Sequence, residues 1–372
     1  MSEGNEFEAP AVKRLASVDA LRGFDMFWII GGRELLLAIV ALFVTPVPVW
    51  LEYQLDHPPW EDYSFAAWDI IMPLFLFVSG VSLPFSMTKW NEGGRRNFYL
   101  RLARRLTILW ILGMAIQGNL LDWDLDKLRL YSNTLQAIAA GYLIATIFLL
   151  TLSMRGQIVA TIALLIGYWA ILMFVPVPEH GAGNVTDPWN NVAKYVDKAV
   201  LGRFTDKWMY AWVLASLGFG ATVMMGVFGG HVLRSKATET KKFSTLVGIG
   251  AGCLAAGWIW SYWHPFIKYI WTSSMNLWAG GWCFLLLAVF YWVIDMRGYR
   301  KWAFPLIVIG TNAIAVYTAT HLFDFGLVSD VFVGELKPRL GDFGAFLSAL
   351  GTFLVPWLIL LYMYKKKTFI RL

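Results

Sequence analysis

The stretch from Ile158 to Val175 reads IVATIALLIGYWAILMFV and decides the class of fold. It contains no charged residue over a length that suits a helix crossing the hydrocarbon core of a bilayer. Its nearly continuous apolar character excludes an outer-membrane barrel, in which apolar and polar residues alternate along each strand. We therefore predict an all-α polytopic membrane protein.

The composition of the whole chain supports the same class. Of 372 residues, 58% are hydrophobic and only 15% are charged, and the chain holds 20 Trp, 26 Phe and 15 Tyr. Aromatic side chains of this kind gather at the two interfaces of a bilayer. We expect one transmembrane domain over residues 1–372, and no removable signal peptide, because the polar segment Met1–Ser17 lacks a short apolar core.

Windows of about 20 apolar residues predict about ten membrane helices. They lie at Ala20–Phe43, Trp68–Met87, Leu106–Leu121, Asn133–Leu152, Ile158–Val175, Met209–Val232, Phe243–Trp263, Met275–Ile294, Phe304–Phe323 and Ala345–Tyr364. Three of the connections between them are long enough to carry chemistry, namely Val44–Ala67, Pro176–Trp208 and Asp324–Gly344.

The distribution of basic residues predicts the orientation of these helices. With both termini in the cytoplasm, 21 Lys and Arg fall on the inner side and 9 on the outer side, as the positive-inside rule requires. The net charge of +6 therefore reflects topology, because the basic residues cluster between apolar runs. We expect no nucleic-acid partner.

The first predicted helix carries ionisable residues that hydrocarbon disfavours. Asp19, Arg22 and Asp25 share one helical face at its cytoplasmic start, where they form either a structural ion network or part of a site. Arg33 and Glu34 follow Gly31-Gly32 at greater depth. We expect them to face a packed or water-lined interior.

His57 is the leading candidate for proton transfer, since imidazole titrates near neutral pH. It precedes a stiff Pro58-Pro59 pair, and Asp69 lies at the start of the next predicted helix. Asp69 either orients the imidazole or caps the helix, and a lone loop histidine is more often a plain surface residue. No two histidines have the i, i+4 spacing of a helical zinc site, so we expect no metal.

Basic side chains at the predicted inner ends of helices form a second candidate group. Guanidinium forks suit phosphates, so Arg101, Arg104, Arg105 and Lys366 are candidates to clamp a polyanion. Positive-inside orientation explains the arginines equally well, and anionic lipid headgroups explain the lysine tail. The amides of Gln136 and Asn312 either pack against a neighbouring helix or take part in chemistry.

Several motifs, in order along nearly the whole chain, resemble one family. They are RLASVDALRG at 14–23, His57-x-x-Trp60, DIIMPLFLFVSG at 69–80, Leu135-Gln136, PFIKYIW at 265–271, GTNAIAVY at 310–317 and the KKK tail at 365–367. This pattern is similar to the membrane acyltransferase family of the lysosomal heparan-alpha-glucosaminide N-acetyltransferase and its bacterial relatives. The compact length looks more like the bacterial branch.

The resemblance implies transfer of acetyl from cytosolic acetyl-CoA to an amino sugar or glycan across a membrane, here expected to be a bacterial inner membrane. It implies that His57 is the acetyl carrier or general base. We further expect Asp56 or Asp69 to hold the tautomer of His57, and Asn312, Gln136 or Lys268 to donate to the thioester oxygen. We expect Arg22 and the inner basic group to bind the donor. The resemblance also suggests a homodimer. For contacts with the acceptor we expect Trp60, Gln136, Lys268 and His321.

Two other functions fit the sequence. A glycolipid transporter or flippase would use Arg33, Glu34 and Asn133 to line a path, although we find no inverted repeat. An O-acetyltransferase of an exported glycan would share the donor and the topology but not the acceptor.

Overall fold

The computed structural model describes residues 15–86 and 90–370, and every regular element within them is helical. The longer helices are α1 (Ala16–Phe27), α2 (Arg33–Ala41), α4 (Ile71–Ser86), α5 (Trp90–Ile116), α6 (Thr134–Thr151), α7 (Met154–Phe174), α8 (Val192–Leu201), α9 (Ser216–Arg234), α10 (Glu239–Ser261), α11 (Ser273–Phe290), α12 (Phe304–Gly310), α13 (Ala313–Leu322), α14 (Phe325–Val333) and α16 (Asp342–Lys365). The predicted N-terminal segment up to Arg14, together with Lys89 and Arg371, lies outside the described residues.

The chain is an integral membrane protein with seven helices that are long and apolar enough to cross a bilayer, among the residues described. They are Ala67–Ser86, Thr134–Thr151, Met154–Phe174, Ser216–Arg234, Glu239–Ser261, Ser273–Met296 and Asp342–Lys365. Each overlaps one of the ten segments that the sequence predicts. An eighth span results if α12 and α13, which meet at 75°, cross together.

The two other predicted spans differ from a plain membrane helix for local reasons. The predicted helix Ala20–Phe43 is interrupted by a π-helical turn, η1 (Trp28–Gly32), in which Gly31 has a φ of 122°. A left-handed backbone of this kind is open to glycine and costly for other residues. The predicted span Leu106–Leu121 lies mostly within the longer α5, which begins with a polar, basic segment. Sequence windows measure apolar length, and they do not detect such breaks.

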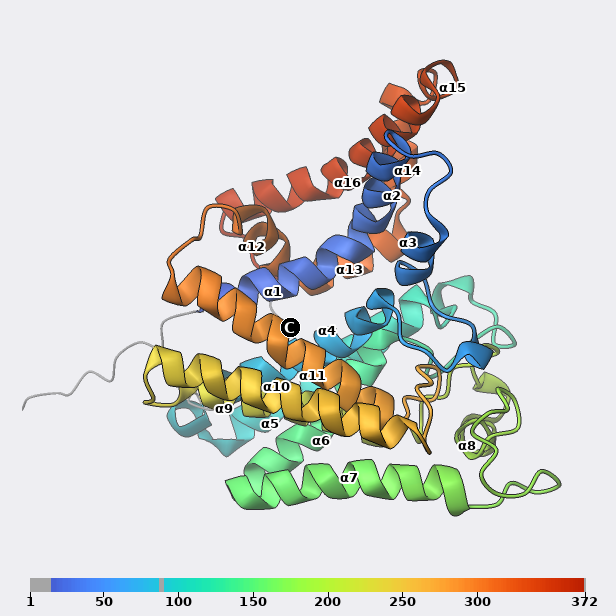
Figure 1. Ribbon diagram of the computed structural model, residues 1–372, viewed down its shortest axis with the longest axis vertical. Coiled ribbons are helices and arrows are strands. Elements are labelled where there is room, and N and C mark those ends of the chain that lie inside the picture. The colour runs from blue at the N-terminus through green and yellow to red at the C-terminus, as the bar shows by residue number, and fades with distance from the viewer. Residues whose placement is uncertain (1–14, 87–89, 371–372) are drawn as a thin grey trace, which may run out of the picture.

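Close contact between α4 and α9 forms the centre of the molecule. A methyl group added at Gly80 would lie 2.0 Å from the Val223 carbonyl oxygen, and one at Gly226 would lie 1.9 Å from that of Phe77. Small residues let membrane helices approach backbone to backbone in this way. Helices α10 and α11 run together along one side, and α7 lies at the edge of the bundle (Figure 1).

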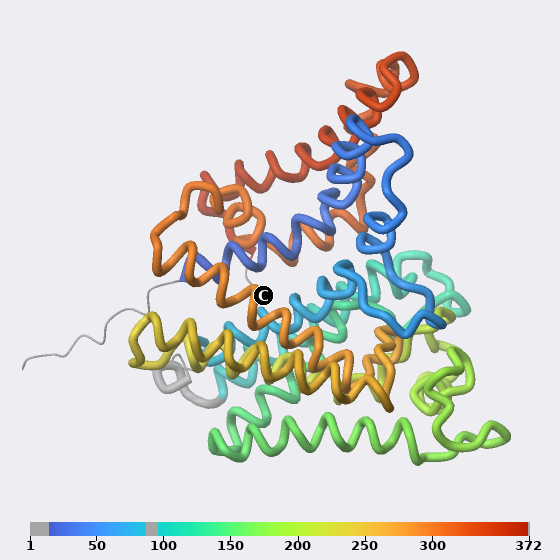
Figure 2. Tube along the Cα trace, in the orientation of Figure 1, coloured from blue at the N-terminus to red at the C-terminus, as the bar shows by residue number. Residues whose placement is uncertain are grey.

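Three connections gather at one end of the bundle, on the right of Figure 2. The first holds α3 (Val49–Gln54) and η2 (Trp60–Asp62), the second holds α8, and the third joins α10 to α11. The buried Lys194 on α8 fixes the second connection, because its Nζ donates to the carbonyls of Asp206, Trp208 and Tyr210. These connections position the side chains of the candidate site.

Candidate active site

His57 and Asp69 form a hydrogen-bonded pair at this end of the bundle. Asp69 lies in the 3₁₀ turn η3 (Ala67–Ile70) that begins α4, and its Oδ2 accepts a hydrogen bond from the Ala66 amide. Its Oδ1 lies 2.8 Å from Nδ1 of His57, and its side chain is only 2% exposed. An ionised carboxylate only accepts hydrogen bonds, so the imidazole carries its proton on Nδ1. The lone pair therefore resides on Nε2.

Lys268 completes the group from the connection between α10 and α11. Its Nζ lies 3.3 Å from Oδ1 of Asp69 and 3.4 Å from Nε2 of His57. The connection is held by Thr272, whose hydroxyl accepts from the Ile267 amide and donates to the Pro265 carbonyl. This loop thus places an ammonium group against the imidazole, 3.1 Å from Nδ1 and 3.4 Å from Nε2.

Burial and the charge of Lys268 favour the neutral form of His57. Burial lowers the pKa of His57, and the positive charge of Lys268 lowers it further, against the raising effect of Asp69 and Asp56. Burial also lowers the pKa of Lys268, although Asp69 opposes this. An imidazole that is neutral and held in one tautomer suits a general base or a nucleophile.

Arg33 holds the segment that carries His57. Its Nε donates to the Leu55 carbonyl at 2.6 Å, and its Nη2 lies 3.4 Å from Oδ2 of Asp56. The guanidinium carbon also lies 5.7 Å from the centre of the Trp68 ring. Arg33 follows the π-helical turn directly, so the break in the first predicted span aims this side chain at the loop.

The group opens into a cavity of about 830 Å³. His57 and Lys268 line it, and so do many polar and aromatic side chains from the predicted outer connections and helix ends. The aromatic members are Trp28, Trp68, Trp208, Tyr210, Trp212 and Tyr317, and the acidic members are Glu34 and Asp206. Ligand cavities range from roughly 300 to 1,000 Å³, so this cavity has the size of a small-molecule binding site.

The other residues expected to bind the acceptor occupy different positions. His321 lines the cavity, with its Nδ1 donating to the Tyr317 carbonyl at 2.8 Å. Trp60 is 3% exposed and stacks on Tyr269, so its ring packs the loop of His57 against the connection between α10 and α11. Gln136 caps α6: its oxygen accepts from Ser132 and Asn133 amides, and its nitrogen donates to the Leu130 carbonyl.

Asn312 lies at the break between α12 and α13 and is bound by the C-terminal tail. Its nitrogen donates to the Thr368 carbonyl, and its oxygen accepts from the Ile370 amide. Both ends of the amide are therefore used in holding the tail.

The predicted donor-binding residues belong to different helices. Arg22 on α1 contacts Ser82 and Asp19, whereas Arg105 on α5 donates to the Tyr142 hydroxyl and covers its ring. Arg101 and Arg104 are exposed on α5, and Lys366 is exposed after α16. Within residues 15–86 and 90–370 no three His, Cys, Asp or Glu side chains are grouped to hold a metal ion.

Sequence analysis missed the aromatic wall that precedes α9. Trp208, Tyr210 and Trp212 alternate along the chain, and all three line the cavity. In an extended segment alternation would place them on one side, and the chain runs here through 205–212 without helix or strand. This period-two spacing is the signal that identifies them, although the sequence does not show which surface they face.

Comparison with known proteins gives one distant relationship. The human protein heparan-alpha-glucosaminide N-acetyltransferase is 24% identical to this chain over 376 residues, which cover 84% of the chain and 53% of the human protein. The chain thus spans about half the length of the curated relative it matches. No model of a known protein family matches the chain.

Proposed function

We propose that this chain, a distant homologue of heparan-alpha-glucosaminide N-acetyltransferase, is a membrane acetyltransferase that moves acetyl from acetyl-CoA to the amine of an amino sugar. The observation that carries the proposal is the contact of His57 with both Asp69 and Lys268 at the wall of the large cavity. A histidine held by a carboxylate and facing a ligand-sized space is typical of acyl transfer.

Nε2 of His57 acts as the general base. An acceptor that arrives as an ammonium first releases one proton to water. Nε2 then takes a proton from the neutral amine as its nitrogen bonds to the acetyl carbon, and it returns that proton to the sulfur as the carbon–sulfur bond breaks. Asp69 holds the tautomer that leaves Nε2 unprotonated. A positioned general base contributes about 10²–10⁴-fold to a rate.

Lys268 stabilises the negative charge that develops on the carbonyl oxygen. Its Nζ lies 3.4 Å from Nε2, so it is next to the position where the tetrahedral intermediate forms. It keeps its ion pair with Asp69 at 3.3 Å in the resting state. Donors aimed in advance at a developing oxyanion are among the largest contributors to enzymatic catalysis.

The cavity wall fits an amino sugar. Aromatic rings such as Trp208 and Tyr210 offer flat apolar faces to a pyranose ring, and the same faces attract a cation. Glu34, whose side chain is 57% exposed, adds a carboxylate that attracts an ammonium group. Carboxylates and aromatic rings in one cavity favour a positively charged acceptor over a neutral alcohol.

The proposed sidedness has both termini in the cytoplasm and His57 on the outer face. Contacts among the described residues support it. Arg234 donates to the Pro84 carbonyl, and the Ser17 amide donates to Asp295, so segments predicted to lie inside meet one another. Segments predicted to lie outside meet around His57. The donor, held by Arg22, Arg105 and Lys366 among others, would reach His57 from the inner side.

The test is acetyl transfer by the purified protein from radiolabelled acetyl-CoA to glucosamine. We expect label on the sugar with the wild type and with His180→Ala, an exposed histidine of another outer connection, and a loss of at least about 10²-fold with His57→Ala. Equal transfer by His57→Ala and His180→Ala would remove His57 from the mechanism.

One observation favours a transporter as the second candidate. The first predicted span and the α12–α13 pair are both broken, and discontinuous helices often bind the substrate of a transporter. Saturable uptake of glucosamine into proteoliposomes, without acetylation and insensitive to His57→Ala, would favour that function.

A further inference from the structure

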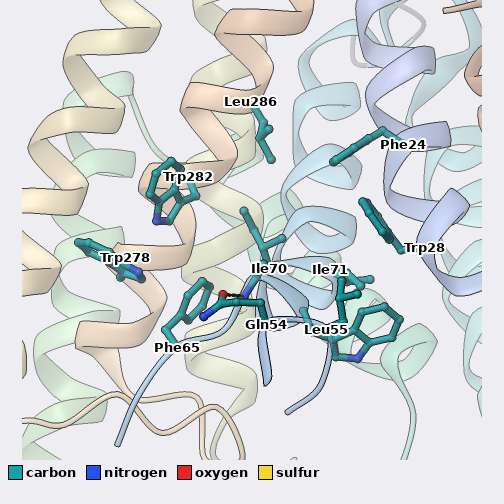
Figure 3. A pocket seen from close by; sticks show the side chains of 12 residues that line it. Phe24, Trp28, Gln54, Leu55, Phe65, Ile70, Ile71, Trp278, Trp282 and Leu286 are labelled. Carbon is teal, nitrogen blue, oxygen red and sulfur yellow. Dashed lines mark hydrogen bonds between the residues drawn. The ribbon is translucent and has the colours of Figure 1, made fainter. Parts of the chain in front are cut away.

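A second cavity, of about 420 Å³, lies between α1 and α11. Figure 3 shows Trp278, Trp282 and Leu286 of α11 on one side, and Phe24 of α1 with Trp28 of η1 on the other. Every lining side chain except Gln54 is aliphatic or aromatic, and the Gln54 oxygen accepts a hydrogen bond from the Ala67 amide. The space therefore suits a ligand without charge or hydrogen-bonding groups.

The apolar cavity opens toward the surface of the bundle. Trp282 is 40% exposed at its edge, and Trp28 is half-buried. Both residues belong to helices that the sequence places in the bilayer, so the opening faces lipid. The hydrocarbon chain of a ligand that enters from the lipid moves from one apolar environment to another, so the hydrophobic effect adds little to its binding free energy. What the chain gains is a fixed position.

The apolar cavity adjoins the cavity of the candidate active site. Trp28, Trp68 and Ile71 line both. The same two backbone segments also build both: Leu55 lines the apolar cavity two residues before His57, and Ile70 lines it directly after Asp69. The apolar cavity therefore lies next to the segments that carry the catalytic pair.

We propose that the apolar cavity between α1 and α11 binds the hydrocarbon chain of an amphipathic acceptor, an amino sugar joined to a lipid, and presents its head group to His57. This inference rests on the proposed acetyltransferase function and names the class of acceptor. The acyl donor does not take this space, because its proposed route begins at the inner basic residues. The polar cavity holds the sugar, and Trp28 and Trp68, which line both cavities, lie at the junction of sugar and chain.

The kinetic test compares decyl glucosaminide with free glucosamine as acceptors, using the full chain in phosphatidylcholine nanodiscs. The nanodiscs contain no detergent, because the alkyl chains of a detergent would compete with decyl glucosaminide for the apolar cavity. Leu286→Trp fills the apolar cavity from a residue that does not line the polar one. Val289→Trp is the matched control on the same helix, at a residue 51% exposed. Decyl glucosaminide partitions into the lipid of the nanodisc to the same extent with both variants, so this effect cancels when the variants are compared.

We expect the ratio of kcat/KM for decyl glucosaminide to that for glucosamine to exceed one in the wild type and in Val289→Trp. It should fall by about tenfold or more in Leu286→Trp, the scale on which an apolar pocket discriminates. An unchanged ratio overturns the proposal. An equal loss with both acceptors also overturns it, because the space would then serve a step common to both.

A second measurement on the wild type does not need turnover or a variant that folds. A decyl glucosaminide with a diazirine in its chain should cross-link to Phe24, Trp28, Trp282 or Leu286, and unlabelled decyl glucosaminide should compete while decanol should not. If neither acceptor is acetylated, this cross-linking pattern would still support a lipid-binding site, and the missing acetylation would contradict the proposed acetyltransferase function. Cross-links spread over all lipid-facing helices, as with a diazirine phosphatidylcholine, remove the binding site itself.

Discussion

The ammonium nitrogen of Lys268 lies 3.1 Å from Nδ1 of His57, although 211 positions separate the two residues in the chain. Lys268 is 8% exposed at its side chain and shares Oδ1 of Asp69 with the histidine. Two groups that carry positive charge when protonated thus compete for one carboxylate. Protonating His57 would place a second cation against the first in a buried setting, which is costly.

The pH profile of acetyl transfer should show this competition. The base form of His57 is the neutral one, and burial with Lys268 lowers its pKa below the ordinary value. The acid limb of kcat/KM should therefore have its midpoint below about 6.5. In Lys268→Met the lowering by the ammonium is lost, so the midpoint should move to higher pH. A limb that stays fixed, or moves to lower pH, would contradict the placement of Lys268.

Asp69→Asn should reduce kcat by about 10²–10⁴-fold without unfolding the protein. An amide at this position donates as readily as it accepts, so it allows the imidazole proton to move to Nε2. The nitrogen that should attack or abstract a proton would then be blocked. Steady-state kinetics check the loss, and Asp126→Asn is the control, because the Asp126 side chain is 89% exposed and lies in another connection. Equal losses in both variants would contradict the role of Asp69 in holding the tautomer.

Arg33→Lys tests whether the loop contact positions His57. Lysine has one donor group and lacks the planar fork that reaches both Leu55 and Asp56. We expect kcat to fall about tenfold, the equivalent of one charge-assisted hydrogen bond of about 1.5 kcal/mol, with Tm and the acid-limb midpoint unchanged. Arg203→Lys is the control, since Arg203 is 64% exposed and pairs with Asp126 at 4.0 Å. A fall in Tm that tracks the loss of rate would make Arg33 a purely structural residue.

The apolar pattern was sufficient to predict where helices lie, and it was insufficient where the backbone turns inside an apolar run. The window over Ile158–Val175 corresponds to α7, because nothing in it interrupts the helix. The window over Ala20–Phe43 spans three elements, because Gly31 adopts a left-handed conformation that hydropathy does not register. The break matters for function, since it turns Arg33 toward the loop of His57.

Part of the candidate site was visible in the sequence, and part depends on tertiary contact. His57 and Asp69 are close in sequence, and a carboxylate at a helix start near a histidine predicts their pairing. Lys268 lies far along the chain, and only the family resemblance selected it. The aromatic wall at Trp208 and Tyr210 had no such guide, because its role depends on which connection it meets in space.

The crossing of α4 and α9 links the stability of the bundle to the site, because α4 follows directly on the turn that holds Asp69. Gly226→Ala places a methyl group 1.9 Å from the Phe77 carbonyl oxygen, so the helices must move apart. Overpacking of this kind costs about 1–3 kcal/mol, and we expect a lower Tm together with lower activity. Gly252→Ala is the matched control, because its added methyl group meets nothing within 4 Å on α10. Thermal unfolding of the two variants in the same nanodiscs checks the difference. Equal Tm values for both variants would mean that α4 and α9 do not approach as closely as their glycines allow. The contact between these helices would then not explain how Asp69 is held in position.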